Sequence, residues 1–459
     1  MKSCPERCCR LVVCSLLVCS SCVSTRKQAE LHYTAGINHF QSGDQTNALI
    51  ELSRAIELNH QYEDAYFARG LAKQALRDYP GALRDYSKTI GWNPHNEPAF
   101  VDRGLCKLGL KDYHGAIADF AKAIELQPED ASAHSYRGLT RSGVRDWEGA
   151  LDDFNKVVEL NPQEATAYRN RAAVQSLLKE HEKAVADASM AIELDGHDAF
   201  SYRIRGLAKS TLKDFGGALA DLDTAVEINP VDGVAYAGRG GVKLEADDFE
   251  GASADLERAI QLSPNNVLAF AARGYLKRKC GDDEGALADF NRAVEFGPQF
   301  AETYESLGLL QYDLVQWRAA LENLRKALEV DSSKDDVRFR IWLMRSQTGE
   351  GEDANKELDA HVKSLRGAKA KEWPASIGRF LTGNLPESEF FNQATTTAKR
   401  PSAVTGQICE ALYYTGMKRK LAGDKEAAAE LFQECLNMGD DNNFGYLSAC
   451  AELRSLKNP

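Results

Sequence analysis

Residues 63–96 read EDAYFARGLAKQALRDYPGALRDYSKTIGWNPHN, and residues 97–130 read EPAFVDRGLCKLGLKDYHGAIADFAKAIELQPED. Both stretches are 34 residues long, and both carry Arg-Gly, Asp-Tyr and a proline at the same positions. Such a fixed period is typical of repeat proteins built from helical pairs. Nine in-register units follow along the chain, starting at residues 29, 63, 97, 131, 165, 199, 233, 267 and 301.

Small residues and prolines hold fixed positions within the unit, counted from its first residue. Glycine at position 8 occurs as Gly36, Gly70, Gly104, Gly138, Gly206, Gly240, Gly274 and Gly308, and alanine holds position 20 in all nine units. Proline at position 32 occurs as Pro94, Pro128, Pro162, Pro230, Pro264 and Pro298. This pattern resembles the tetratricopeptide repeat (TPR) family, a helix–turn–helix of 34 residues. The resemblance implies an all-α fold, a right-handed TPR superhelix (α-solenoid) of about nine regular units plus degenerate C-terminal helical units.

The physical roles of these residues agree with helical pairs. Glycine and alanine allow two antiparallel helices to approach closely, and proline suits the entry to a following helix. An aspartate at position 16 is expected to cap the second helix of its unit; these residues are Asp78, Asp112, Asp146, Asp214, Asp248 and Asp282. Each unit leaves an apolar face open, so stacking on its neighbours is needed to bury it.

Seven inner units carry arginine at position 7, where the family usually has an apolar residue, and the same seven carry aspartate at position 23. A fixed partner at a fixed offset favours structural ion pairs between helices over a basic ladder that grips a ligand. The predicted pairs are Arg69 with Asp85, Arg103 with Asp119, Arg137 with Asp153, Arg171 with Asp187, Arg205 with Asp221, Arg239 with Asp255, and Arg273 with Asp289.

The N-terminus predicts a signal segment over residues 1–22. A basic start precedes the apolar run LVVCSLLVC, which is too short to anchor the chain in a bilayer. The stretch VCSSCV resembles a bacterial lipobox, with Cys22 as the cysteine that would carry the lipid and palmitate-type acyl chains. Several acyl chains would hold the chain on a membrane, where one chain would not. A plain cleaved signal peptide and an uncleaved start remain the alternatives.

Beyond the nine units, which span residues 29–334, the period weakens. Residues 335–368 predict a degenerate TPR-like pair, residues 369–408 a connector with one or two helices, and residues 409–459 a final TPR unit with a capping helix. The order W-P, G-R-F-L-x-G and Q-x-C-E-A-x-Y-Y-x-G in this region resembles NlpI-type envelope lipoproteins. The larger number of repeats departs from that family.

The resemblance implies an adaptor for proteins or peptides, with envelope proteases and peptidoglycan enzymes as partners, often as a homodimer. It implies the outer membrane, facing the periplasm, as the location. The net charge of −12 argues against a nucleic-acid partner. Two alternatives remain: a cytosolic TPR co-chaperone-type binding protein, and an enzyme with a site in residues 366–459, where Glu372, Arg379, Glu387, Glu389 and Glu410 are available.

The TPR resemblance also implies a concave groove lined by positions 2, 5, 9 and 12 of the first helices. The candidate ligand residues at these positions are Tyr33, Phe67, Arg169, Arg203, Tyr275 and Arg278, together with Asn170 beside Arg169. The alternative for Arg169 and Arg203 is pairing with nearby carboxylates, since the protein is acidic. Whether the groove or the convex face binds is left open.

The sequence predicts no metal site, no cofactor and no catalytic residues, because no phosphate loop, HExxH or GxSxG occurs. Cys409 and Cys435 fall at helix ends that an antiparallel pair would bring together. An envelope disulfide and two buried free thiols are both compatible with this placement, and the thiols are favoured.

Overall fold

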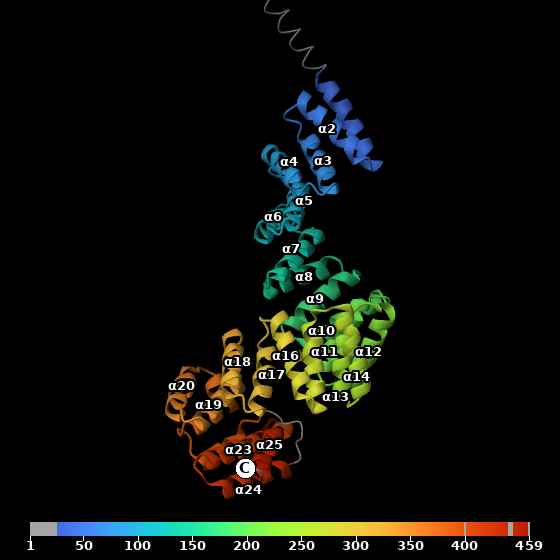
Figure 1. Ribbon diagram of the computed structural model, residues 1–459. Coiled ribbons are helices and arrows are strands. Elements are labelled where there is room, and N and C mark those ends of the chain that lie inside the picture. The colour runs from blue at the N-terminus through green and yellow to red at the C-terminus, as the bar shows by residue number, and fades with distance from the viewer. Residues whose placement is uncertain (1–24, 399–400, 439–443, 458–459) are drawn as a thin grey trace, which may run out of the picture. The chain divides into compact units, whose positions relative to one another are not determined.

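The computed structural model describes residues 25–398, 401–438 and 444–457, and every element assigned in these ranges is a helix (Figure 1). The chain divides into an N-terminal unit, Met1–Ala246, and a C-terminal unit, Asp247–Pro459. None of the helices in the described ranges is both long enough and apolar enough to cross a membrane. The predicted all-α class is confirmed.

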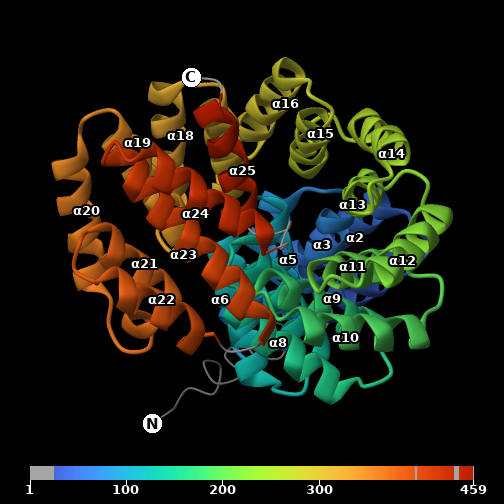
Figure 2. The same cartoon turned by 90° about the horizontal axis from the view of Figure 1, so that it is seen from below.

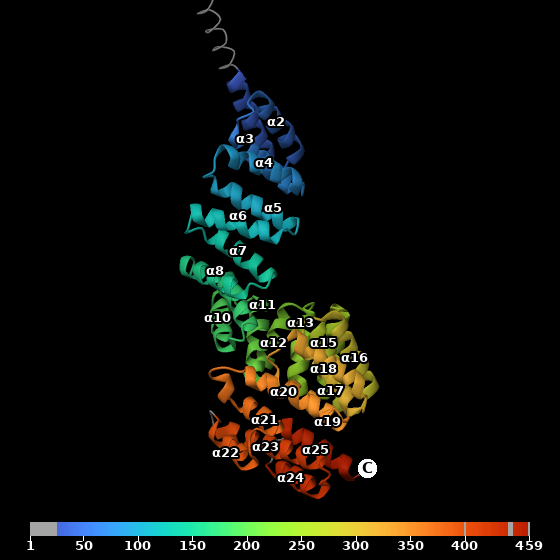
Figure 3. The ribbon, with the colours of Figure 1, turned by 90° about the vertical axis from the view of Figure 1, so that its left-hand side faces the viewer.

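The N-terminal unit contains six complete helical hairpins and the first helix of the next. A first helix over residues 25–41 precedes α2 (Gln45–Leu58), α3 (Glu63–Ala75), α4 (Tyr79–Trp92), α5 (Glu97–Gly109), α6 (Tyr113–Leu126), α7 (Ala131–Gly143), α8 (Trp147–Leu160), α9 (Ala165–Leu177), α10 (His181–Leu194), α11 (Ala199–Thr211), α12 (Phe215–Ile228) and α13 (Gly233–Glu245). Figure 3 shows α3 to α8 as successive hairpins, each stacked on the next.

The C-terminal unit continues with α14 (Phe249–Leu262), α15 (Val267–Lys279), α16 (Asp283–Phe296), α17 (Ala301–Asp313), α18 (Trp317–Val330), α19 (Asp335–Gln347) and α20 (Gly351–Ser364). A short 3-10 helix, η1 (Lys369–Lys371), leads to α21 (Trp373–Leu381), α22 (Glu387–Thr396), α23 (Pro401–Leu421), α24 (Lys425–Asn437) and α25 (Phe444–Lys457). The helical pair predicted at 335–368 lies at α19 and α20.

The first helix of the last hairpin begins earlier than predicted. The repeat period placed its start at Cys409, but α23 begins at Pro401 and so takes in the end of the predicted connector. Proline lacks the amide hydrogen that a first-turn residue does not need, so Pro401 is a suitable first residue of the helix. The period alone carried no information about this extension.

Aspartate caps fix the start of most second helices. The carboxylates of Asp78, Asp112, Asp146, Asp214, Asp248 and Asp282 each accept a hydrogen bond of 2.9–3.1 Å from the amide of the glycine three residues on. This satisfies one of the free amides of the first turn. The predicted capping role is therefore confirmed.

Glycine at position 8 provides the close approach of the two helices. A β-carbon added at Gly70 would lie 2.6 Å from Tyr86 Cε1, and one added at Gly104 would lie 2.7 Å from Phe120 Cε1. Both aromatic side chains are fully buried. The glycines thus leave the space that the second helix fills with a large apolar side chain at position 24.

A left-handed residue at position 15 turns the chain between the two helices of most units. Glycine suits this conformation, but Val315 holds it in the ninth unit with φ 61°. A β-branched residue is strained there.

We expect Val315→Gly to stabilise the C-terminal unit by about 1 kcal/mol, measured by thermal unfolding. Val330→Gly, in the last turn of α18, is the matched control and is expected to destabilise; a loss of stability in Val315→Gly would contradict the prediction.

Candidate binding site

The repeated spacing of arginine and aspartate in the inner units produces ion pairs between the two helices of a unit. Six predicted pairs have nitrogen–oxygen distances of 2.6–2.8 Å: Arg69–Asp85, Arg103–Asp119, Arg137–Asp153, Arg171–Asp187, Arg205–Asp221 and Arg273–Asp289. All six aspartates are buried. The seventh arginine, Arg239, bonds Asp223 at 2.7 Å.

A second cation, which the sequence interpretation missed, shares many of these aspartates. It comes from position 11 of the first helix, one turn after the arginine, at distances of 2.6–2.8 Å in five units: Lys73, Lys107, Arg141, Lys209 and Lys277. Burial acts to raise the pKa of Asp289, but hydrogen bonds from Arg273 and Lys277 outweigh it and hold that pKa below its usual range. The recurrence of a basic residue at position 11 was the signal that could have revealed it.

Five of the seven arginines, namely Arg69, Arg103, Arg171, Arg205 and Arg239, also contact the preceding unit. Their second guanidinium branch donates to position 25 of that unit at 2.7–3.3 Å, onto Ser53, Ser87, Asn155, Ser189 and Asp223. In six units, the guanidinium carbon of the position 7 arginine also lies 5.3–5.6 Å from the centre of the aromatic ring at position 4 of the same unit. The guanidinium groups are thus committed to the repeat framework, which supports the structural interpretation of the ladder.

The candidate ligand residues of the N-terminal unit largely contact their own neighbours. Tyr33 packs on Tyr62 with ring centres 5.1 Å apart, and Phe67 packs on Tyr86 at 5.7 Å. Asn170 is partly exposed on α9. The rings of Tyr33 and Phe67 are thus mostly packing surface.

The two candidate arginines of the fifth and sixth units are charge-neutralised. Arg169 lies 3.4 Å from Asp198, and Arg203 lies 2.9 Å from Asp232. Both guanidinium groups also lie near the ring of Phe200, at 5.5 Å and 4.3 Å. The structure therefore places both arginines against nearby carboxylates, as in the alternative interpretation of the sequence.

Two further candidates lie in the C-terminal unit. The Tyr275 hydroxyl lies 2.6 Å from Ser306 Oγ on the next first helix. Arg278 forms an ion pair with Asp313. Arg278 also lines a cavity of about 1020 Å³ with Asp313, so of the seven candidate ligand residues it is the one at this cavity.

The cavity is lined by the first helices α15, α17 and α19 of successive hairpins, by α18, and by the C-terminal helices α23 and α25. Groove positions 9 and 12 of the ninth unit contribute Leu309 and Tyr312, and α19 contributes Arg340 and Leu343. Helices α23 and α25 also contribute lining residues. Figure 2 shows α19, α23 and α25 close together on one side of the C-terminal unit. Cavities of this size accept ligands larger than a single side chain.

A buried carboxylate from α25 enters this cavity. Glu452 is only 7% exposed, forms an ion pair with Lys420 of α23, and accepts a hydrogen bond of 3.4 Å from the Tyr312 hydroxyl. Burial, with the charge of Glu452, raises the pKa of Tyr312, so its hydroxyl stays protonated and can donate. Cations, a phenol and aliphatic side chains therefore meet at one place, which suits recognition of an acidic and apolar group.

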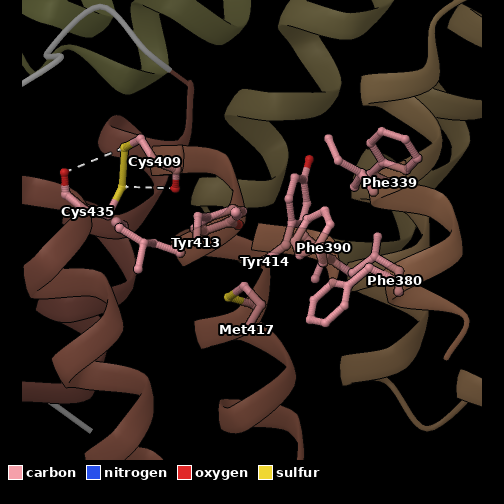
Figure 4. Packing of buried hydrophobic residues seen from close by; sticks show 14 of the residues in the cluster. Phe339, Phe380, Phe390, Cys409, Tyr413, Tyr414, Met417 and Cys435 are labelled. Atoms are coloured by element: carbon pink, nitrogen blue, oxygen red, sulfur yellow. Dashed lines mark hydrogen bonds between the residues drawn. A yellow bond between two sulfur atoms is a disulfide. The ribbon is translucent and has the colours of Figure 1, made fainter. Parts of the chain in front are cut away.

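An aromatic core packs α21 to α24 together with α19, α20 and α25 (Figure 4). Phe390 is fully buried and stacks on Phe380 and Trp373, with ring centres 4.2 Å and 5.0 Å away. The Cys409 and Cys435 sulfurs are joined as a disulfide, with Cα atoms 4.8 Å apart. The preference for two free thiols was therefore wrong. Cys409 lies in the interior of α23, because that helix begins at Pro401, and it faces Cys435 in the last turn of α24 within bridging distance.

The acidic and basic residues considered for catalysis do not converge. Glu410 accepts a hydrogen bond from Trp373 Nε1 at 2.6 Å, Arg379 donates to the Ala370 carbonyl at 3.0 Å, and Glu387 pairs with Arg419 at 2.9 Å. Within the described ranges no group of three or more His, Cys, Asp or Glu side chains is placed to hold a metal ion. Cys22, the predicted lipidation site, lies outside the described residues.

Comparison with known proteins gives two family-model matches, both described as tetratricopeptide repeat, over residues 98–130 and 137–199. A search of curated proteins finds no relative. Among solved structures, YrrB, titled a TPR protein with an unusual peptide-binding site, is 21% identical, with 41% of this chain and 97% of that chain covered and a TM-score of 0.35.

Two more solved structures are similar at comparable levels. PilF of Pseudomonas aeruginosa is 19% identical, with 45% of this chain and 94% of that chain covered and a TM-score of 0.39. MamA of Desulfovibrio magneticus RS-1 is 22% identical, with 37% and 97% covered and a TM-score of 0.36. The repeat period, the stacked helical hairpins and the two family-model matches together identify tetratricopeptide repeats in this chain.

Proposed function

We propose that this protein is a non-catalytic adaptor, anchored by lipid at Cys22 in a bacterial cell envelope, that docks segments of partner proteins on its first-helix surface. The observation that carries the proposal is the cavity of about 1020 Å³, where Arg278, Leu309 and Tyr312 from groove positions of consecutive repeats lie together. Tetratricopeptide repeats are typical of protein-binding scaffolds. The cavity supplies the concave, mixed apolar and polar lining that a binding site needs.

The cysteine chemistry supports an envelope location. The disulfide between Cys409 and Cys435 suits an oxidising compartment such as the periplasm. The lipobox-like VCSSCV stretch supports a lipid anchor, and the residues after Cys22 are Val and Ser. The resemblance of the C-terminal region to NlpI-type lipoproteins supports envelope proteases or peptidoglycan enzymes as partners, and a homodimer as the assembly.

The anchor is tested by lipid labelling and fractionation of the wild type beside Cys22→Ser in a bacterial host. We expect the wild type to incorporate labelled palmitate and to fractionate with the outer membrane, and the variant to lose both properties. Lipid attachment requires the cysteine thiol, which serine does not supply. A wild-type protein that takes up no label and stays at full length in the cytosol would contradict the proposal.

The docking surface is tested in the same cells with a photo-crosslinking amino acid placed in the full-length chain. Val315 lines the cavity and is 63% exposed, whereas Val330 is 43% exposed and does not line it. We expect a partner to crosslink from position 315 and not from position 330. Equal crosslinking from both positions would show that the cavity is not the docking site.

A further inference from the structure

The cavity in the C-terminal unit holds more positive than negative charge, although the whole chain carries −12. Its cations are Arg278, Arg340, Lys420 and Arg454, and its acids are Asp313 and Glu452. Asp313 is taken up by the ion pair with Arg278 from the neighbouring repeat. The remaining acidic side chain in the cavity, Glu452, belongs to the C-terminal helix α25.

Glu452 lies where a ligand carboxylate would be held. Lys420 donates to one of its oxygens and the Tyr312 hydroxyl to the other, so the contact uses a cation and a neutral donor from two different helices. Charge-assisted contacts of this kind are the strong ones in partly buried sites. The two donors come from α17 and α23, and Tyr312 and Glu452 are 140 residues apart in sequence, so the site is not part of the repeat pattern.

The surroundings of Glu452 specify a second property of a ligand. Leu309, Leu343 and Leu421 line the same cavity. In the chain itself, Leu453 follows Glu452 and is 7% exposed, within the aromatic core cluster. The cavity therefore surrounds the Glu452 carboxylate with aliphatic side chains, whereas Leu453 itself packs in the core and anchors α25 outside the cavity lining.

We propose that this cavity is a binding site for an acidic protein segment with an apolar residue beside its carboxylate, and that Glu452 of α25 is the chain's own occupant of the carboxylate subsite. This inference rests on the proposed adaptor function and gives it a ligand class. A partner segment gains Lys420 and Tyr312 by displacing Glu452. The C-terminal helix thus competes with the partner, and its release sets the affinity.

The test uses the full-length protein and a fluorescent peptide with the sequence of residues 444–457, in which Cys450 is replaced by serine. A second peptide also carries glutamine in place of Glu452, as the neutral control. Binding is measured by fluorescence anisotropy. We expect Glu452→Gln in the protein to bind the acidic peptide about tenfold more tightly than the wild type, because the internal competitor has lost its charge. The neutral peptide is expected to bind at least tenfold more weakly than the acidic one.

Two further variants separate binding from damage to the fold. Leu453→Ala keeps the charge of Glu452 but weakens the docking of α25, so it is also expected to bind the acidic peptide more tightly. Lys420→Met in the Glu452→Gln protein is expected to lose the gain. The matched control is Lys326→Met, since Lys326 pairs with Glu322 on the exposed face of α18, and it is expected to leave the affinity unchanged.

The proposal is overturned if neither Glu452→Gln nor Leu453→Ala tightens binding, or if the neutral peptide binds as well as the acidic one. If this peptide assay fails while a partner still crosslinks from position 315, the adaptor function stands and only its ligand class is wrong. If the peptide binds as expected but the wild type is neither lipid-labelled nor in the envelope, the site stands and the proposed location is wrong.

Discussion

Replacing Asp153 with alanine is expected to destabilise the hairpin of α7 and α8 by about 4 kcal/mol. The Asp153 side chain is 1% exposed and binds Arg137 at 2.6 Å and Arg141 at 2.8 Å. Removing the carboxylate leaves two cations that are largely withdrawn from solvent without their partner, and leaves a small void. Because stacked repeats need not unfold as one unit, the effect is best measured by hydrogen exchange of α7 and α8 together with the unfolding midpoint.

The neighbouring aspartate provides a matched control. Asp152 is exposed on the same helix, and Asp152→Ala removes the same atoms one residue away. We expect a change within about 0.5 kcal/mol, as is usual for surface positions. Equal losses in the two variants would show that the buried ion pair contributes no specific stability.

Replacing Phe390 with alanine is expected to destabilise the C-terminal helices by about 4 kcal/mol. Its ring is fully buried between Trp373 and Phe380, so the substitution removes stacking contacts on both faces and leaves a cavity. The loss should appear as a lower unfolding midpoint and as faster exchange of the amides of α21 and α22.

Phe391, the next residue along α22, is only partly buried against the same core. Phe391→Ala is therefore the matched control, with an expected loss of about 1–2 kcal/mol. A Phe390→Ala protein as stable as Phe391→Ala would contradict the role given to the stacked rings.

The regular part of the fold was predictable because each role recurs in one chain. Position 8 glycine, position 16 aspartate and the pairing of positions 7 and 23 each occur many times, so chance agreement is small. The helices follow this register, and six of the predicted ion pairs form between the two helices of their own units. The second cation at position 11 was present in the same register and was overlooked.

The candidate site was not predictable in the same way. It depends on how α23 and α25 return to the first helices of the last repeats, and no period links Tyr312 or Lys420 to Glu452. The start of α23 at Pro401 and the disulfide are likewise single events in the sequence. The position of a residue within the repeat does not show which carboxylates of the chain lie near it. Arg169 and Arg203 therefore proved to be paired with carboxylates inside the chain.

The double contact of four position 7 arginines bears on how the number of repeats can change. Arg69, Arg103, Arg171 and Arg205 each take an aspartate from their own unit and a polar side chain at position 25 from the unit before it. Duplication or deletion of 34 residues in register would therefore keep both kinds of partner where the unit before the arginine has a polar residue at position 25, but not after the third unit, which has Ala121 there. At the polar junctions the copy number could change without compensating substitutions, whereas the C-terminal cavity, which is built once, would keep its composition.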